Sequence, residues 1–505
     1  MAEPCYTCRR RHIQCDRSQT PCLKCQKAGL ECLDKRPVRW VQGVAIRGTM
    51  RGRSYQNTLV ASRPVGELKM HSISTAETPS PSASNGDPST DLQLVSAPPT
   101  PSIPSIPPSV DDRALYQLDE SSQYYLDYYN QRICQLFIVY DSQNNPFRSL
   151  IPLAFGDKVL LDAMLALAAR HRANFEQPFS TSSAEPMSMA TNRDKEALRF
   201  KYRAIQGLAH SINTQHPYKD GTVASVFLLV FLDLLESGCD RWNYHLEGAK
   251  NLMALKPSHD PGRTIEKVRK FIIKQIHLIE ALGATFVRPK LLNNYAPTDH
   301  SANMMEDVVE ESFLGCPEYI LTSVQFFSLQ RDMVAGGTPS DEISLGGITP
   351  VLDAVKQFDC YTWASSLPQE SVRDIDDLCK LARVYQLGAI LYGGRVLDAI
   401  QNVQTNQKTT VSELIGVIDM LQRGSDLLKC ALWPIVVAGL ECHQQSQRNV
   451  LIQAMEEFWA DTKCLNVSNA AKILQGHWKK IDDGEIVATD WIFDIGRSSH
   501  DWLLI

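Results

Sequence analysis

The chain has 505 residues, of which 44% are hydrophobic and 21% are charged, and its formal net charge is −6. This composition supplies enough apolar side chains for at least one large core, so a wholly disordered chain is excluded. The N-terminus lacks the apolar segment of a secretory signal peptide, and the longest apolar run, Val223–Leu232, is far shorter than the roughly 20 residues that cross a bilayer. We therefore expect a soluble, intracellular protein that does not bind membranes.

The charge is divided unevenly along the chain. Residues 1–53 contain twelve Lys or Arg side chains and four acidic ones, whereas the remaining residues contain 39 basic and 53 acidic side chains. A short basic head favours contact with a polyanion, and the acidic body would repel the same polyanion.

Six of the fourteen cysteines lie in this head with the spacing C-x2-C-x6-C-x6-C-x2-C-x6-C; they are Cys5, Cys8, Cys15, Cys22, Cys25 and Cys32. A disulfide framework would need an oxidising compartment, which nothing in the sequence indicates. One tetrahedral zinc ion would use four sulfurs and leave two over, whereas two ions need eight bonds and therefore two bridging sulfurs. The spacing predicts a binuclear zinc cluster, and the metal must supply most of the folding free energy of so short a segment.

This pattern, with Pro21 before the fourth cysteine and Gly29 three residues before the sixth, resembles the fungal Zn2Cys6 binuclear-cluster transcription factors. The resemblance implies a nuclear protein whose short helix enters the major groove of double-stranded DNA, commonly at CGG-like triplets. It also implies a set of zinc ligands. Cys5 and Cys22 would bridge the two ions, Cys8 and Cys15 would complete one site, and Cys25 and Cys32 would complete the other.

The resemblance also indicates which side chains contact DNA. Arg11 fits a guanine reader because its guanidinium can donate to both O6 and N7, and His12 stands where the family usually has a second basic reader. Gln14 replaces a usual phosphate-contacting lysine and gives up one positive charge. The expected phosphate contacts are Arg9, Gln14, Arg17, Lys24 and Lys27.

Residues 1–35 are therefore predicted to form the DNA-binding domain, and two connecting segments follow. Residues 36–70 form a basic arm or linker, and its stretch RWVQGVAIRGTMRGR resembles a subset of the family related to the acriflavine sensitivity control protein. Residues 71–112 form a disordered linker, since 23 of the 40 residues in 71–110 are Pro, Ser or Thr. No heptad repeat follows the cysteines, so a dimerising coiled coil is not expected and the oligomeric state stays open.

From 113 to 505 the apolar residues recur with a helical period, which predicts a large all-α regulatory domain. Three stretches resemble the family's helical "fungal-specific transcription factor" region: VYDSQNNPFRSLI, WNYHLEGAKNLM and LWPIVVAGLEC. The predicted helices are Lys158–His171, Asn192–Asn213, Thr222–Leu235, Trp242–Leu255, Thr264–Leu282, Asp374–Ile400, Val411–Ala438, Asn449–Cys464 and Ala470–Ile481.

No enzyme motif occurs in this region, and we expect no catalytic residue. His245 and Glu247 are two residues apart on a helix and point to different faces, so we expect capping or surface roles for them. Residues such as Met164, Phe227 and Trp433, and the eight isolated cysteines, are expected in the core. A hydrophobic effector pocket between helices is possible.

The segment 481–505 alternates acidic and apolar side chains. Such alternation is typical of a segment that folds on a coactivator, but the same aromatic residues would also fit the end of a helical core.

The predicted function is a nuclear, sequence-specific transcription factor of the RNA polymerase II type that uses two structural Zn²⁺ ions and recruits coactivators or corepressors. The pathway expected first is a secondary-metabolite gene cluster, with drug-resistance or nutrient-response genes as the alternative. A zinc-dependent protein-interaction scaffold without specific DNA reading is the alternative from another class.

Overall fold

The computed structural model describes residues 4–5, 7–8, 13–16, 21–28, 32, 118–180, 191–214, 220–254, 263–287, 312–337, 345–368, 372–485, 490–497 and 500–505. They belong to two units, Met1–Thr100 and Pro101–Ile505, which are described separately. The predicted arm and Ser/Pro-rich linker, 36–112, lie outside the described residues. In the first unit the chain forms the short helix α2, Leu23–Lys27.

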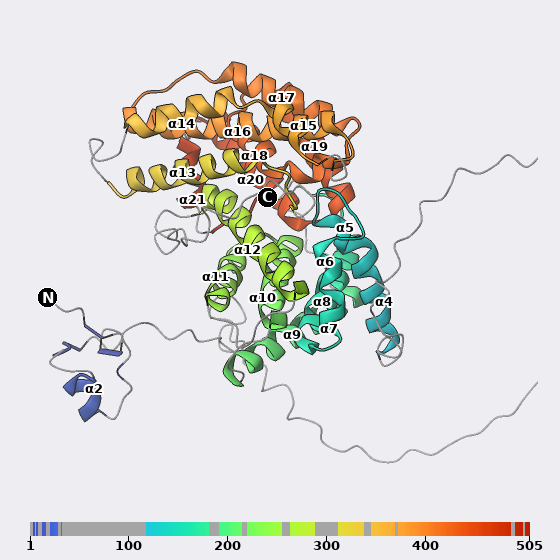
Figure 1. Cartoon of the computed structure of the whole chain (residues 1–505). Coiled ribbons are helices and arrows are strands. Elements are labelled where there is room, and N and C mark those ends of the chain that lie inside the picture. Colours follow the sequence, from blue (N-terminus) through green and yellow to red (C-terminus); the bar gives the residue numbers. More distant parts are fainter. Residues whose placement is uncertain are drawn as a thin grey trace, which may run out of the picture. The chain divides into compact units, whose positions relative to one another are not determined.

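The second unit is helical throughout its described ranges, which contain no β-strand and one isolated β-bridge, between Cys239 and Trp502 (Figure 1). The predicted all-α domain is thus confirmed. Its α-helices are α4 (Glu120–Tyr128), α5 (Cys134–Leu136), α6 (Pro146–Ser149), α7 (Ile151–Ala154), α8 (Lys158–Asn174), α9 (Asn192–Thr214), α10 (Asp220–Glu236), α11 (Arg241–Met253), α12 (Arg263–Gly283), α13 (Glu318–Ala335), α14 (Leu345–Gln357), α15 (Cys360–Ser366), α16 (Ile375–Gln401), α17 (Lys408–Gln422), α18 (Leu432–Leu440), α19 (Gln445–Thr462), α20 (Leu465–Asp482) and α21 (Trp491–Arg497). A π-helical turn, η2 (Tyr129–Ile133), and two 3-10 turns, η3 (Ala284–Phe286) and η6 (Asp426–Cys430), complete the unit. None of the described helices is long and apolar enough to span a bilayer.

Helix α10 lies at the centre of the first half of this unit. Every residue from Gly221 to Leu235 is buried, and the helix packs against α8, α9, α11 and α12. Phe231 is fully buried, with four phenylalanine rings at centroid distances of 4.5–5.5 Å: Phe137, Phe147, Phe227 and Phe313. A helix that is apolar on all sides is expected in such a position.

Helix α16 plays the corresponding part in the second half, where α13 to α19 gather (yellow to orange in Figure 1). The Asp374 carboxylate caps its first turn, and Asn402 ends it in a left-handed conformation. Two glycines let neighbouring aromatic side chains come close. A Cβ at Gly388 would lie 2.7 Å from the Trp433 ring, and one at Gly393 would lie 2.6 Å from the Phe327 ring.

The predicted helices agree closely with the structure except for Val411–Ala438, which is wrong. The chain ends α17 at Gln422, turns at Gly424, forms η6 and begins α18 at Leu432. Ser425 starts the 3-10 turn by accepting a hydrogen bond from the Leu427 N–H (3.2 Å). Helices α4 to α7, α13 to α15 and α21 were not predicted.

The end of the sequence packs into the core rather than remaining free for a coactivator. Trp491, Leu503 and Leu504 have no exposed surface, so the packing interpretation of the acidic–apolar segment is confirmed. The backbone N–H of Leu503 donates to the Gly238 carbonyl (2.7 Å), between α10 and α11.

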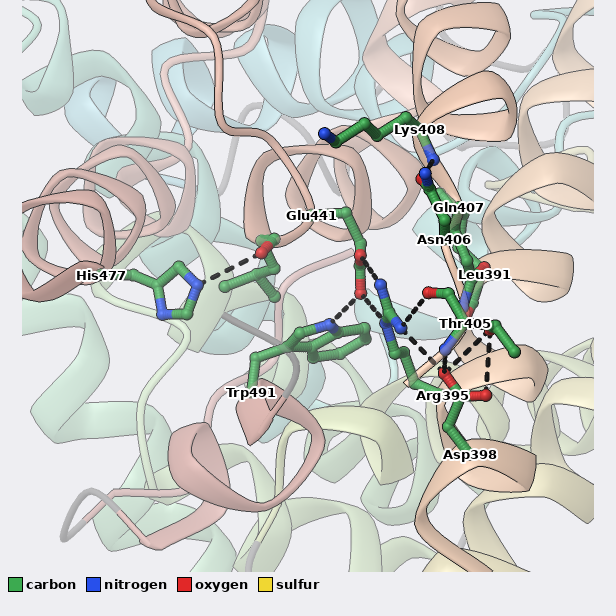
Figure 2. Close-up of polar contacts among 11 residues, drawn as sticks. Leu391, Arg395, Asp398, Thr405, Asn406, Gln407, Lys408, Glu441, His477 and Trp491 are labelled. Atoms are coloured by element: carbon green, nitrogen blue, oxygen red, sulfur yellow. Dashed lines mark hydrogen bonds and ion pairs between the residues drawn. The ribbon is translucent and has the colours of Figure 1, made fainter. Parts of the chain in front are cut away.

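A buried polar network holds Trp491 in place (Figure 2). The Arg395 guanidinium donates twice to the Glu441 carboxylate, at 2.7 Å each, and its Nη1 donates to Asp398 at 2.8 Å. The Trp491 indole N–H donates to the same Glu441 carboxylate (2.7 Å), and Thr405 donates to Asp398. Since every member has a partner, the network joins α16, α18 and α21 without an orphaned charge.

The residues predicted to form the core mostly do so. Met164, Phe227 and Trp433 are fully buried, six of the eight isolated cysteines are buried, and Cys239 and Cys379 are half-buried. The surface role expected for His245 is wrong, because its ring is buried and its Nε2 lies 3.6 Å from the Asp233 carboxylate.

Candidate metal centre and nucleic-acid interface

The two C-x2-C pairs of the head adopt the same local arrangement. The backbone N–H of Cys8 points to the Cys5 sulfur (3.4 Å), and the N–H of Cys25 points to the Cys22 sulfur (3.4 Å). In the second pair this contact also caps the start of α2. The repeated spacing therefore produces a repeated turn that directs both sulfurs of each pair to one side.

The four sulfurs of these pairs form a compact, buried group. The separations across the pairs are 3.7–3.8 Å, for Cys5 and Cys8 each with Cys22 and Cys25, and all four atoms lie within 4.8 Å of one another. Zinc–sulfur bonds of about 2.3 Å place the sulfurs of a tetrahedral site about 3.8 Å apart. The donor set and its spacing therefore fit zinc.

The remaining two cysteines border this group. Cys15 and Cys32 are half-buried against it, the Cys15 sulfur lies within 4.8 Å of that of Cys22, and the Cys22 N–H points to the Cys32 sulfur (3.4 Å). All six predicted ligands thus converge. The sulfurs of Cys8 and Cys25 are 3.8 Å apart, although the resemblance assigns these two residues to different ions. Each is about equally close to the first cysteine of the other pair, Cys8 to Cys22 and Cys25 to Cys5.

The electrostatics distinguish the two positions of each pair. The N–H of Cys25 lowers the pKa of Cys22, and the pKa of Cys5 is also lowered because hydrogen bonds from Cys8 and its neighbours outweigh burial. Burial raises the pKa of Cys8, and burial together with contact to Cys22 raises the pKa of Cys25 to about 12.

Three of the seven predicted DNA contacts lie within the described residues. Gln14, Lys24 and Lys27 are all exposed, and both lysines are on α2. The others lie outside the described residues: Arg9, Arg11, His12 and Arg17. Two apolar side chains of the described head, Ile13 and Leu23, are also about two-fifths exposed.

The helical unit holds a cavity of about 450 Å³ with a mostly polar lining. Side chains of both charge signs line it, among them Arg132, Asp141, Arg373, Asp377, Lys429 and Asp461. Several already pair with protein groups, such as Lys429 with the Gln135 carbonyl (2.8 Å).

Comparison with known proteins agrees with both parts of the molecule. Residues 3–40 match the model of the fungal Zn(2)-Cys(6) binuclear cluster domain, and residues 124–505 match that of the fungal specific transcription factor domain. The acriflavine sensitivity control protein acr-2 of Neurospora crassa is 21% identical over 572 residues, covering 95% of this chain and 92% of the relative. No solved structure matches. The second domain occupies most of the chain, and with the cysteine-rich head it identifies the protein as a member of the fungal Zn2Cys6 transcription factors, which are regulators rather than enzymes.

Proposed function

We propose that this chain is a nuclear regulator of transcription by RNA polymerase II that holds two structural zinc ions and binds specific sites in double-stranded DNA. The observation that carries the proposal is the convergence of six cysteines, four of them buried, beside the exposed Lys24 and Lys27. Zinc ligated by sulfur alone has no open position for water, so its role is to fold the head rather than to catalyse a reaction.

The proposed ligands are the six cysteines, with Cys5 and Cys22 shared between the ions. The experiment is metal analysis of the full chain and of Cys22→Ala. Loss of a bridging sulfur should remove both ions of the head, whereas loss of a terminal ligand in Cys32→Ala should leave one ion more firmly held than the other. A loss of a single zinc in Cys22→Ala would contradict the bridging assignment.

The proposed DNA contacts divide into base readers and phosphate contacts. Arg11 and His12 would read a guanine-rich, CGG-like triplet, and the phosphate contacts would be Arg9, Gln14, Arg17, Lys24 and Lys27. Selection of binding sites with wild type, His12→Gln and His12→Lys tests the reading. His12→Lys should strengthen the preference for guanine by about 1–3 kcal/mol. Identical base preferences in all three proteins would mean that Arg11 reads alone.

The helical unit would connect DNA binding to coactivators or corepressors and to one pathway. A secondary-metabolite gene cluster is the first candidate, and drug-response genes are the second, which the name of the acr-2 relative favours. Mapping bound promoters together with transcript changes in a deletion strain separates them. Bound genes in one contiguous block support the first candidate, and scattered transporter genes with altered acriflavine tolerance support the second. Binding to no promoter would favour the scaffold alternative.

A further inference from the structure

We propose that Cys239, Asp240 and His500 form a second metal site, for a single divalent ion such as Zn²⁺, in the helical unit. One ligand atom from each residue lies within 4.8 Å of the others. The thiol and the carboxylate come from the turn between α10 and α11, and the imidazole comes from the segment after α21. The three side chains supply sulfur, oxygen and nitrogen, the ligand types that zinc prefers.

The backbone brings the two segments together independently of any ion. The Asp240 N–H donates to the Asp501 carbonyl (2.8 Å), and the Asp501 N–H donates back to the Asp240 carboxylate (2.7 Å). Cys239 and Trp502 form the β-bridge, and the Trp242 indole donates to the Asp501 carbonyl (3.1 Å). His500 is therefore held beside the turn by the two residues that follow it, Asp501 and Trp502.

The turn itself has an uncommon conformation. Asp240 has φ 57° and ψ −43°, and the Arg241 N–H donates to the Cys239 carbonyl (2.6 Å) across it, which makes a γ-turn of the rare, strained kind. This conformation places the side chains of adjacent residues, Cys239 and Asp240, in one ligand group.

The ligand distances require little adjustment for a metal. His500 Nδ1 and the Asp240 carboxylate are 2.7 Å apart as a hydrogen-bonded pair, and ligand bonds of about 2.0–2.1 Å would separate them to about 3.3 Å. Both side chains are partly exposed, 52% and 38%, so they can move apart and water can fill a fourth position.

The charges also balance. A thiolate and a carboxylate with a neutral imidazole carry two negative charges, which one dication neutralises. Binding of the metal to the Cys239 thiol releases its proton to solvent as the metal–sulfur bond forms.

The test is zinc content per full-length chain after dialysis against zinc-buffered solution, for wild type, Cys239→Ser and His500→Gln. Both variants should hold one zinc fewer than wild type and retain the ions of the head. Cys379→Ser, which removes the other half-buried isolated cysteine, should match wild type. The same zinc content in wild type and His500→Gln would overturn the proposal, and because His500 is half exposed this variant should still fold.

A second measurement uses Co²⁺ as the probe. The thiolate-to-cobalt absorption of the wild type should contain a component that is missing from both Cys239→Ser and His500→Gln. An identical spectrum in all three would mean that the three side chains form a hydrogen-bonded cluster only. Both readouts are independent of DNA binding, so failure here leaves the proposed function of the head intact.

Discussion

The head and the helical unit are stabilised by different means. In the described part of the head the buried side chains are four cysteines, with two more half-buried, which is too little apolar surface to stabilise a fold. The helical unit has one continuous core in which residues as far apart as Tyr125 and Ile505 participate. Folding of the head therefore depends on the concentration of free zinc, whereas folding of the helical unit depends on the packing of its core.

Removal of zinc should produce the largest difference between the two units: the head unfolds and the helical unit stays folded. Structural zinc contributes about 10–16 kcal/mol in small domains, so a strong chelator should unfold the head and abolish specific DNA binding. The helical unit should keep a cooperative thermal transition. Circular dichroism and fluorescence anisotropy with labelled DNA measure the two effects, and loss of the helical transition in chelator would contradict the comparison.

Phe231→Ala should destabilise the helical unit and leave the head folded. The substitution removes a ring that contacts four others and should destabilise the helical unit by about 3–5 kcal/mol, through a cavity that α10 cannot close. The denaturant midpoint measures this, and the zinc content of the head should not change. Tyr202→Ala, at an exposed ring on α9, should cost less than about 0.5 kcal/mol.

Acid should weaken the helical unit through His171. Burial lowers the pKa of His171 to about 4, below its unfolded value of about 6.5, and the ring contacts the Tyr128 hydroxyl (2.9 Å) and the Thr462 carbonyl (3.1 Å). Its contribution is complete above pH 6.5 and is lost as the pH falls towards 4, by at most about 3 kcal/mol.

The difference between wild type and His171→Gln isolates this effect from the other titrating groups. The unfolding free energy of the variant should fall less steeply between pH 6.5 and 4. His210→Gln, at an exposed position on α9, should follow the wild type. If the unfolding free energies of wild type and His171→Gln fall in parallel as the pH is lowered, the ring has the same pKa in the folded and unfolded states.

The smallest effect concerns the charges on α2. Each phosphate contact contributes about −0.9 to the slope of log K against log salt concentration, so Lys24→Gln with Lys27→Gln should flatten the slope by about 1.8. Lys270→Gln, an exposed lysine of the helical unit, should leave the slope unchanged. An unaltered slope in the double variant would remove α2 from the phosphate contacts.

The sequence allowed the head and the longer helices to be predicted because their patterns are local. Six cysteines with fixed spacing permit few arrangements around zinc, α8 and α10 are long and apolar along most of their length, and α16 carries a long apolar face. The break between α17 and α18 was missed although Gly424, Ser425 and Asp426 mark it, because the apolar period on either side continues through them and Ser425 competes for the backbone there.

Other features could not be predicted because they join distant parts of the chain. His500 and Asp240 are 260 residues apart, and the Trp491 indole meets a carboxylate 50 residues earlier. His245 appeared polar on its own helix, and its burial is determined by α10, which contributes Asp233. Periodicity reveals which face of a helix is buried but not which helix covers it.

Gly388 and Gly393 of α16 have a consequence for mutational screens. One added methyl group at Gly388 would collide with Trp433, and one at Gly393 would collide with Phe327, both rigid rings that the surrounding core holds in place. Missense alleles recovered in a screen for lost regulation should therefore include Gly388 and Gly393, in the interior of the longest helix. Such alleles would mimic a null strain while their DNA-reading residues stayed unchanged, and they should revert through smaller residues at positions 433 and 327.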